Sequence, residues 1–122
     1  MTAVDTRRML IVEDETDVRD FLNRAFGRIA THTVVDTAQN GAEALDLLLQ
    51  QHYDLVVSDN RMPLMTGIEM ISAARAQGLT VPILIFSADI TVERAALAAG
   101  ATAFLHKPIA LDTILTIVKR WL

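Results

Sequence analysis

Residues 55–63, which read LVVSDNRMP, contain the stretch from which the fold can be inferred. The first three of them form a short apolar and β-branched run, which predicts a strand buried on both faces. The stretch reaches a carboxylate at Asp59, and Pro63 and Gly67 then prevent regular structure from following at once. Open α/β sheets bind their ligands at the carboxyl ends of their strands. We therefore hypothesise that Asp59 is a nucleophile that receives a phosphoryl group, the alternative being an aspartate that merely ends a strand.

Outward from this stretch, apolar runs alternate with segments of helical periodicity along the whole chain. The sequence predicts further strands over residues 9–12, 33–36, 81–86 and 103–105. It predicts helices over residues 16–29, 40–51, 66–78, 92–100 and 111–121. Asn40 and Thr66 are side chains typical of helix N-caps. Five strands alternating with five helices predict a parallel sheet covered on both faces, with right-handed crossovers.

Size and composition narrow the class of protein. A chain of 122 residues indicates one domain, residues 1–122, and 52% hydrophobic against 21% charged residues is typical of a globular fold. A net charge of −4 without a basic block argues against direct nucleic-acid binding. The lack of cysteine excludes disulfides and thiolate chemistry. No apolar run approaches the ~20 residues that span a bilayer, and residues 1–8 lack a secretion signal, so we expect a cytoplasmic protein without membrane contact.

Chemically active side chains follow four of the five predicted strands. Glu13 and Asp14 come after the first strand, Asp59 ends the third, Ser87 ends the fourth and Lys107 follows the fifth. In a sheet ordered 2-1-3-4-5, the topological switch point lies between the first and third strands. We therefore expect a flavodoxin-like, doubly wound α/β fold whose crevice holds three carboxylates beside a hydroxyl and an ammonium group.

Three carboxylates at one site repel each other, and burial makes the repulsion more costly. Lys107 is one cation that offsets them, and Mg²⁺ is another, because it prefers oxygen ligands in octahedral geometry. With both cations present, an anionic phosphoryl group has partners, and Asp59 can attack phosphorus to give an aspartyl phosphate. A free aspartate has a pKa of about 3.9, so Asp59 needs no general base at neutral pH.

In these features the chain resembles the receiver domain of bacterial two-component response regulators, and the resemblance covers nearly its whole length. The motifs that carry it are Glu13-Asp14, Asp59 followed by Met62-Pro63 and Gly67, Ser87-Ala88, and Phe104 three residues before Lys107-Pro108. Each motif is weak alone, but together, in order and at the ends of the predicted strands, they are specific. Many members of the family carry Asp, Thr and Tyr where this chain has Glu13, Ser87 and Phe104.

The resemblance implies a metal site and a phosphoacceptor. Asp59 would accept the phosphoryl group from a sensor histidine kinase or a histidine phosphotransfer protein. Glu13 and Asp14 would help to bind Mg²⁺, and Arg61 would offer its backbone carbonyl to the ion. The domain would catalyse only its own phosphoryl transfer and autodephosphorylation, and it would control an output domain or effector that this chain does not contain.

The resemblance also implies the parts of a switch. Ser87 and Lys107 would contact the phosphoryl group, and Phe104 would be the aromatic switch residue. Without the family motif, Phe104 would be interpreted as a core residue and Ser87 as a helix cap. We further expect a cis peptide bond at Lys107-Pro108, because the chain must turn sharply there.

Side chains beside the phosphoacceptor lead to one more expectation. Arg61 and Asp89 carry opposite charges on two loops over the same mouth. We expect them to form an ion pair that partly covers the site.

Three alternative functions are less consistent with the sequence. A flavin-binding module needs a phosphate-cradling loop after the first strand, where Glu13, Asp14 and Glu15 would instead repel a phosphate. A metal-dependent phosphatase usually has a second acid two residues after the nucleophile, and Arg61 occupies that position. A degenerate, unphosphorylated interaction domain would not need the complete set of pocket residues.

Overall fold

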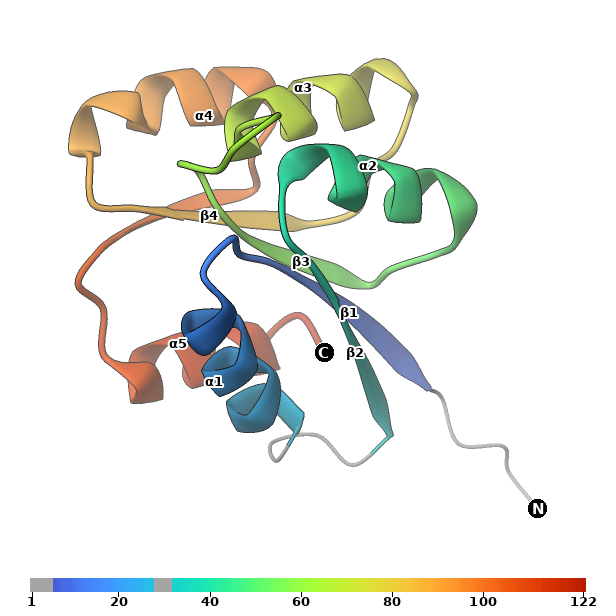
Figure 1. Cartoon of the computed structure of the whole chain (residues 1–122), viewed down its shortest axis with the longest axis vertical. Helices are drawn as coiled ribbons and strands as arrows, with labels where there is room; N and C mark the ends of the chain where they lie inside the picture. The colour runs from blue at the N-terminus through green and yellow to red at the C-terminus, as the bar shows by residue number, and fades with distance from the viewer. Residues whose placement is uncertain (1–5, 28–31) are drawn as a thin grey trace.

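The computed structural model describes residues 6–27 and 32–122. Its sheet has five parallel strands in the order β2-β1-β3-β4-β5, as predicted. The strands are β1 (Arg7–Val12), β2 (Thr33–Ala38), β3 (Leu55–Asp59), β4 (Ile83–Ser87) and β5 (Ala103–His106). The helices are α1 (Thr16–Gly27), α2 (Gly41–Gln50), α3 (Gly67–Ala76), α4 (Glu93–Ala99) and α5 (Leu111–Lys119), with a 3₁₀ turn at Ile90–Val92. Helices α1 and α5 cover one face of the sheet, and α2, α3 and α4 cover the other (Figure 1).

The two sides of the sheet hold separate hydrophobic clusters because successive side chains of a strand point to opposite faces. Leu10, Val56 and Ile85 belong to the cluster under α2, α3 and α4. Val57 and Phe86 belong to the cluster under α1 and α5. The central strands are therefore buried on both faces, as the apolar run before Asp59 predicts. Because the central strands are held in the core, the polar residues at their ends have defined positions.

Helix caps set where two of the helices begin. The Asn40 side chain accepts a hydrogen bond of 2.8 Å from the backbone N–H of Glu43 at the start of α2. At α3, Thr66 accepts from the backbone N–H of Glu69 at 3.2 Å, and the Glu69 carboxylate accepts from the N–H of Thr66 at 3.0 Å. Both predicted caps are confirmed, and the second is a reciprocal capping box.

Several predicted boundaries were wrong. The strand β4 begins at Ile83 because Pro82 cannot donate to the ladder, and α5 ends before Trp121. Phe21 and Leu49 share the apolar periodicity of their helices, yet they are 49% and 51% exposed. A helix on a sheet buries a narrow stripe, which Phe26 and Leu48 occupy. Ile29, the last predicted apolar residue of the first helix, lies outside the described residues.

None of the helices in the described part of the chain is long and apolar enough to cross a membrane.

Candidate functional site

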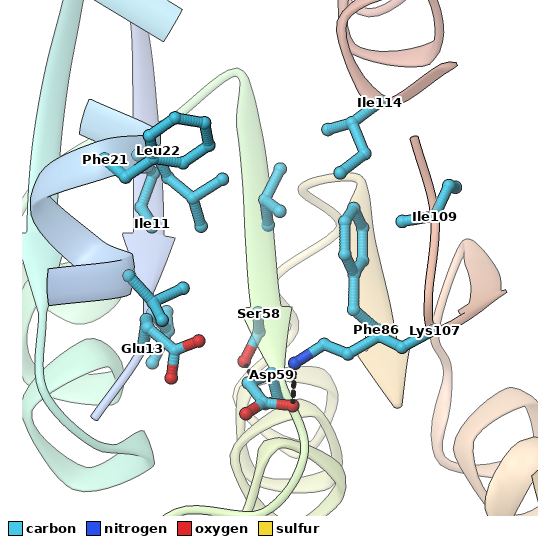
Figure 2. A pocket seen from close by; sticks show the side chains of 13 residues that line it. Ile11, Glu13, Phe21, Leu22, Ser58, Asp59, Phe86, Lys107, Ile109 and Ile114 are labelled. Carbon is cyan, nitrogen blue, oxygen red and sulfur yellow. Dashed lines mark hydrogen bonds and ion pairs between the residues drawn. The ribbon is translucent and has the colours of Figure 1, made fainter. Parts of the chain in front are cut away.

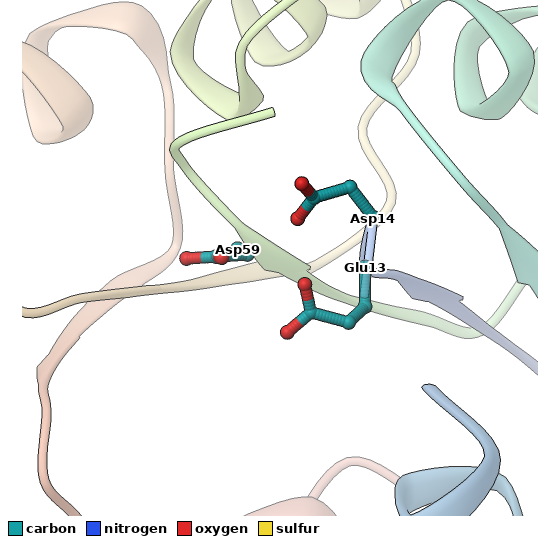
Figure 3. A group of neighbouring side chains, drawn as sticks. All are labelled: Glu13, Asp14 and Asp59. Carbon is teal, nitrogen blue, oxygen red and sulfur yellow. The ribbon is translucent and has the colours of Figure 1, made fainter. Parts of the chain in front are cut away.

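Three carboxylates meet at the ends of the neighbouring strands β1 and β3. Glu13, Asp14 and Asp59 each place one oxygen so that all three oxygens lie within 4.8 Å of one another (Figure 3). The predicted acidic cluster is therefore formed. Hard oxygen donors suit Mg²⁺, and oxygens bound to Mg²⁺ at about 2.1 Å are at most about 4.2 Å apart. The donor set fits the ion with small side-chain adjustments or with a bridging water.

The buried member of the cluster is Glu13, which is only 4% exposed. Burial raises the pKa of its carboxyl to about 7, and a hydrogen bond with Asp14 and the negative charge of Asp59 act in the same direction. The backbone N–H of Glu15 and the charge of Lys107 act against the rise. The local environment thus disfavours a third negative charge, and a bound cation would remove that penalty.

Asp59 is held from one side by two donors. The ammonium nitrogen Nζ of Lys107 lies 3.2 Å from Oδ1 of Asp59 (Figure 2), and the backbone N–H of Asn60 donates to the same oxygen at 2.9 Å. Within residues 6–27 and 32–122, no hydrogen bond reaches Oδ2 of Asp59. The Asp59 side chain keeps 17% of its surface exposed. An electrophile from solvent can therefore reach a carboxylate that is already oriented.

The loop between β3 and α3 is fixed by a residue whose role the sequence did not indicate. The backbone carbonyl of Asn60 accepts from the N–H of Gly67 at 2.9 Å, and its side-chain oxygen accepts from the N–H of Ile68 at 3.0 Å. A Cβ at Gly67 would overlap the Asp59 carbonyl oxygen, which explains the glycine. The spacing from Asn60 to the helix matches no standard cap, so no local signal could have identified this contact.

The remaining predicted site residues surround the mouth beside Asp59. A cavity of about 510 Å³ is lined by Asp59, Arg61, Ser87, Ala88, Asp89 and Lys107. The Ser87 hydroxyl oxygen accepts from the backbone N–H of Asp89 at 3.0 Å. Phe104 does not line this cavity; it lies on β5 opposite Ile85 and packs against the cluster under α4. The Lys107-Pro108 peptide bond is cis, as expected.

The expected ion pair between Arg61 and Asp89 was wrong. The ion pairs of the described residues do not include it. The Asp89 carboxylate instead accepts from the backbone N–H of Thr91 at 3.0 Å and from its hydroxyl at 2.5 Å. Asp89 thereby caps the 3₁₀ turn, and this local arrangement competes with a pair across the mouth.

A second, apolar cavity of about 280 Å³ adjoins the acidic site on the side of α1 and α5 (Figure 2). Phe21, Ile109 and Ile114 form part of its wall, and Glu13 and Lys107 lie at its polar end. The half-exposed Phe21 belongs to this wall. The lining residues come from both helices and several strands, so only the tertiary structure brings them together.

Comparisons with known proteins agree with this geometry. The model of the response regulator receiver domain family matches residues 9–119. Regulatory protein AtoC of Escherichia coli strain K12 is 40% identical over 122 residues, which are 98% of this chain and 26% of AtoC. Response regulator MprA of Mycobacterium sp. strain KMS is 41% identical over 110 residues, 88% of this chain and 47% of MprA. The chain thus spans less than half the length of these two relatives.

Solved structures show the same fold over almost the whole chain. Chemotaxis response regulator CheY4 of Vibrio cholerae superposes with a TM-score of 0.84 at 31% identity, covering 97% of this chain and 100% of that one. Response regulator TrrA of Thermotoga maritima, solved in complex with Mg²⁺ and BeF, gives 0.84 at 29% identity, covering 96% and 100%. The family match, the relatives and the strand-end site lead to the same conclusion: this chain belongs to the family of response regulator receiver domains.

Proposed function

We propose that Asp59 is the phosphoacceptor of this receiver domain and that its phosphorylation requires Mg²⁺ held by Glu13, Asp14 and Asp59. The observation that supports this most strongly is the placement of Asp59 between an ammonium group and two further carboxylates. Mg²⁺, when bound, would offset the charge of the carboxylates and of the incoming phosphoryl group. The backbone carbonyl of Arg61 would complete the oxygen ligands from this chain.

In the proposed reaction, Oδ2 of Asp59 attacks the phosphorus of a phosphohistidine or a small phosphodonor. A P–O bond to Asp59 forms as the bond to the leaving group breaks, and the leaving group takes the electron pair. Lys107 would pair with a phosphoryl oxygen, and the Ser87 hydroxyl would donate to another. Both groups are already at the mouth of the cavity beside Asp59. Attack of water on phosphorus, in line with the Asp59 oxygen, would reverse the modification and make the domain catalyse its own dephosphorylation.

The proposed partners are a sensor histidine kinase or histidine phosphotransfer protein, and an output domain or effector. The half-exposed Val18 and Phe21 lie beside the acidic site on α1, where a phosphodonor protein could bury them. Phe104 would move when Ser87 engages the phosphoryl group and would report the change at β5. We infer that residues 1–122 form a single receiver domain and that the exchange takes place in the cytoplasm.

The test is phosphorylation by acetyl phosphate, measured by intact mass, in wild type, Asp59→Asn and the matched control Asp46→Asn on the exposed side of α2. We expect the wild type and the control to gain one phosphoryl group with Mg²⁺ and to lose this ability in EDTA. Asp59→Asn should gain none, although its nearly isosteric side chain should leave the fold intact by circular dichroism. An acid-labile, Mg²⁺-dependent phosphoryl group on Asp59→Asn would contradict the proposal.

A further inference from the structure

The end of β4 is attached to β5 through the backbone. Ser87 lies opposite His106 in the register of the two strands, and the backbone N–H of Lys107 donates to the Ser87 carbonyl at 2.8 Å. This bond belongs to the edge of the sheet and fixes the Ser87 main chain. Movement of the loop that follows must therefore begin after the Ser87 carbonyl.

The first residue of that loop is held by a side chain. Nε2 of His106 lies 3.1 Å from the backbone carbonyl oxygen of Ala88. A carbonyl oxygen only accepts hydrogen bonds, so Nε2 carries the hydrogen and the imidazole donates. Both the neutral Nε2–H tautomer and the imidazolium ion provide this donor. The contact links β5 to the loop between β4 and α4 without using the strand ladder.

The Ser87 hydroxyl is engaged within the same loop. Its oxygen accepts from the N–H of Asp89, so the loop closes back on Ser87 across Ala88. A displacement of the Ser87 hydroxyl oxygen toward a phosphoryl group would break its contact with the Asp89 N–H, and the Ala88 carbonyl lies inside this turn. A bond that holds the Ala88 carbonyl therefore favours the conformation in which Ser87 is turned to its own loop.

We propose that His106 is a positioning residue whose imidazole holds the Ala88 carbonyl and thereby opposes the engagement of Ser87 with the phosphoryl group. The proposal rests on the function proposed above. His106 also lies two residues beyond Phe104 and on the same face of β5, so one strand carries both the contact that restrains the loop and the aromatic residue expected to respond to it.

The expected size of the effect follows from the type of contact. A neutral hydrogen bond contributes a modest net free energy, and this one is exposed, so its loss should change the balance of two conformations about 2- to 5-fold. A ligand that binds the engaged conformation better should then bind more tightly by the same factor. The variants are His106→Leu, which removes the donor, and His106→Gln, which keeps an N–H donor. His52→Leu is the control, because His52 is exposed and precedes β3 at the opposite end of the sheet.

The test is titration with beryllium fluoride in excess Mg²⁺, followed by amide NMR spectra. The apparent Kd should fall about 2- to 5-fold in His106→Leu and stay at the wild-type value in His106→Gln and His52→Leu. Without ligand, the Asp89 and Thr91 amide signals of His106→Leu should lie on the line joining the free and saturated wild-type signals. An unchanged Kd, or signals off that line, would overturn the role of His106. A wild-type protein that does not bind beryllium fluoride would instead overturn the proposed function.

Discussion

At the scale of single residues, the proposed function depends on the balance of charge around Asp59. Lys107 lies 3.2 Å from Asp59, where its positive charge would favour a phosphoryl group and oppose a metal cation. Two unit charges 4 Å apart interact by about 1 kcal/mol even in bulk water, and by more where water is partly excluded. One side chain should therefore have opposite effects on the two ligands.

Replacement of Lys107 by methionine should separate these effects. We expect Lys107→Met to bind Mg²⁺ at least about 3-fold more tightly, because a competing cation is lost, and to bind beryllium fluoride more weakly, because the anion loses a partner. Isothermal titration with each ligand measures both affinities. The control is Lys119→Met, an exposed substitution in α5 that should change neither. If both affinities shift in the same direction, the charge of Lys107 is not the cause.

At the scale of elements, the predictions succeeded where the information was local. The apolar runs of β1 and β3, and the caps Asn40 and Thr66, are properties of neighbouring residues, and all were predicted. The acidic cluster was predicted because side chains at the ends of parallel strands must lie at one edge of the sheet. The exposure of Leu49 and the contacts of Asn60 and His106 were missed because they depend on how loops and helices pack on the finished sheet.

The loop between β3 and α3 offers a direct test of this packing. Gly67→Ala should destabilise the domain by about 1–3 kcal/mol, because its Cβ would overlap the Asp59 carbonyl oxygen and displace backbone. Gly27→Ala at the end of α1 is the matched control, since no atom of residues 6–27 and 32–122 lies within 4 Å of its added Cβ. Urea unfolding measures both free energies. If the two substitutions lowered the free energy of unfolding equally, the loop would accommodate the added methyl group without strain.

The start of β3 provides a prediction about pH. The Asp54 carboxylate accepts from the backbone N–H of Arg8 at 2.8 Å. Burial acts to raise the pKa of Asp54, but this bond and the neighbouring His52 and Arg7 outweigh it and hold the pKa below its usual value. A carboxyl with a depressed folded-state pKa stabilises the fold above its unfolded pKa of about 3.9, and this contribution is lost as the pH falls through the folded value.

Asp54→Asn should therefore remove part of the acid sensitivity. Compared with wild type, we expect the variant to be less stable at pH 6 and to lose less stability between pH 6 and pH 3. Urea unfolding at the two pH values gives the four free energies. Glu43→Gln, on the exposed side of α2, is the control and should follow the wild type. A variant with the wild-type loss of stability on acidification would rule out Asp54 as a source of that loss.

At the scale of the whole molecule, metal binding at the acidic cluster should be coupled to folding. Three carboxylates within 4.8 Å repel each other in the folded chain and separate when it unfolds. A cation that binds only the folded state should therefore stabilise it by about 2.7 kcal/mol at a concentration one hundred times its Kd. For a domain of this size, that corresponds to a rise in Tm of roughly 8–13 °C.

Thermal melts in EDTA and in Mg²⁺ test this coupling. We expect Mg²⁺ to raise the Tm of the wild type and EDTA to reverse the rise. Asp14→Asn should melt above the wild type in EDTA, because one repelling charge is gone, and should gain less from Mg²⁺, because one ligand is weaker. A variant that melts below the wild type in EDTA and gains as much from Mg²⁺ would show that Asp14 is not part of the site.

The central claim is that Asp59 receives the phosphoryl group, and locating the modification tests it most directly. The protein is phosphorylated with acetyl phosphate and Mg²⁺, the acyl phosphate is reduced with borohydride, which converts the modified aspartate to homoserine, and the peptides are sequenced by mass spectrometry. Our account predicts homoserine at position 59. Reduction at Glu13, Asp14 or any other carboxylate, with Asp59 unmodified, would contradict it.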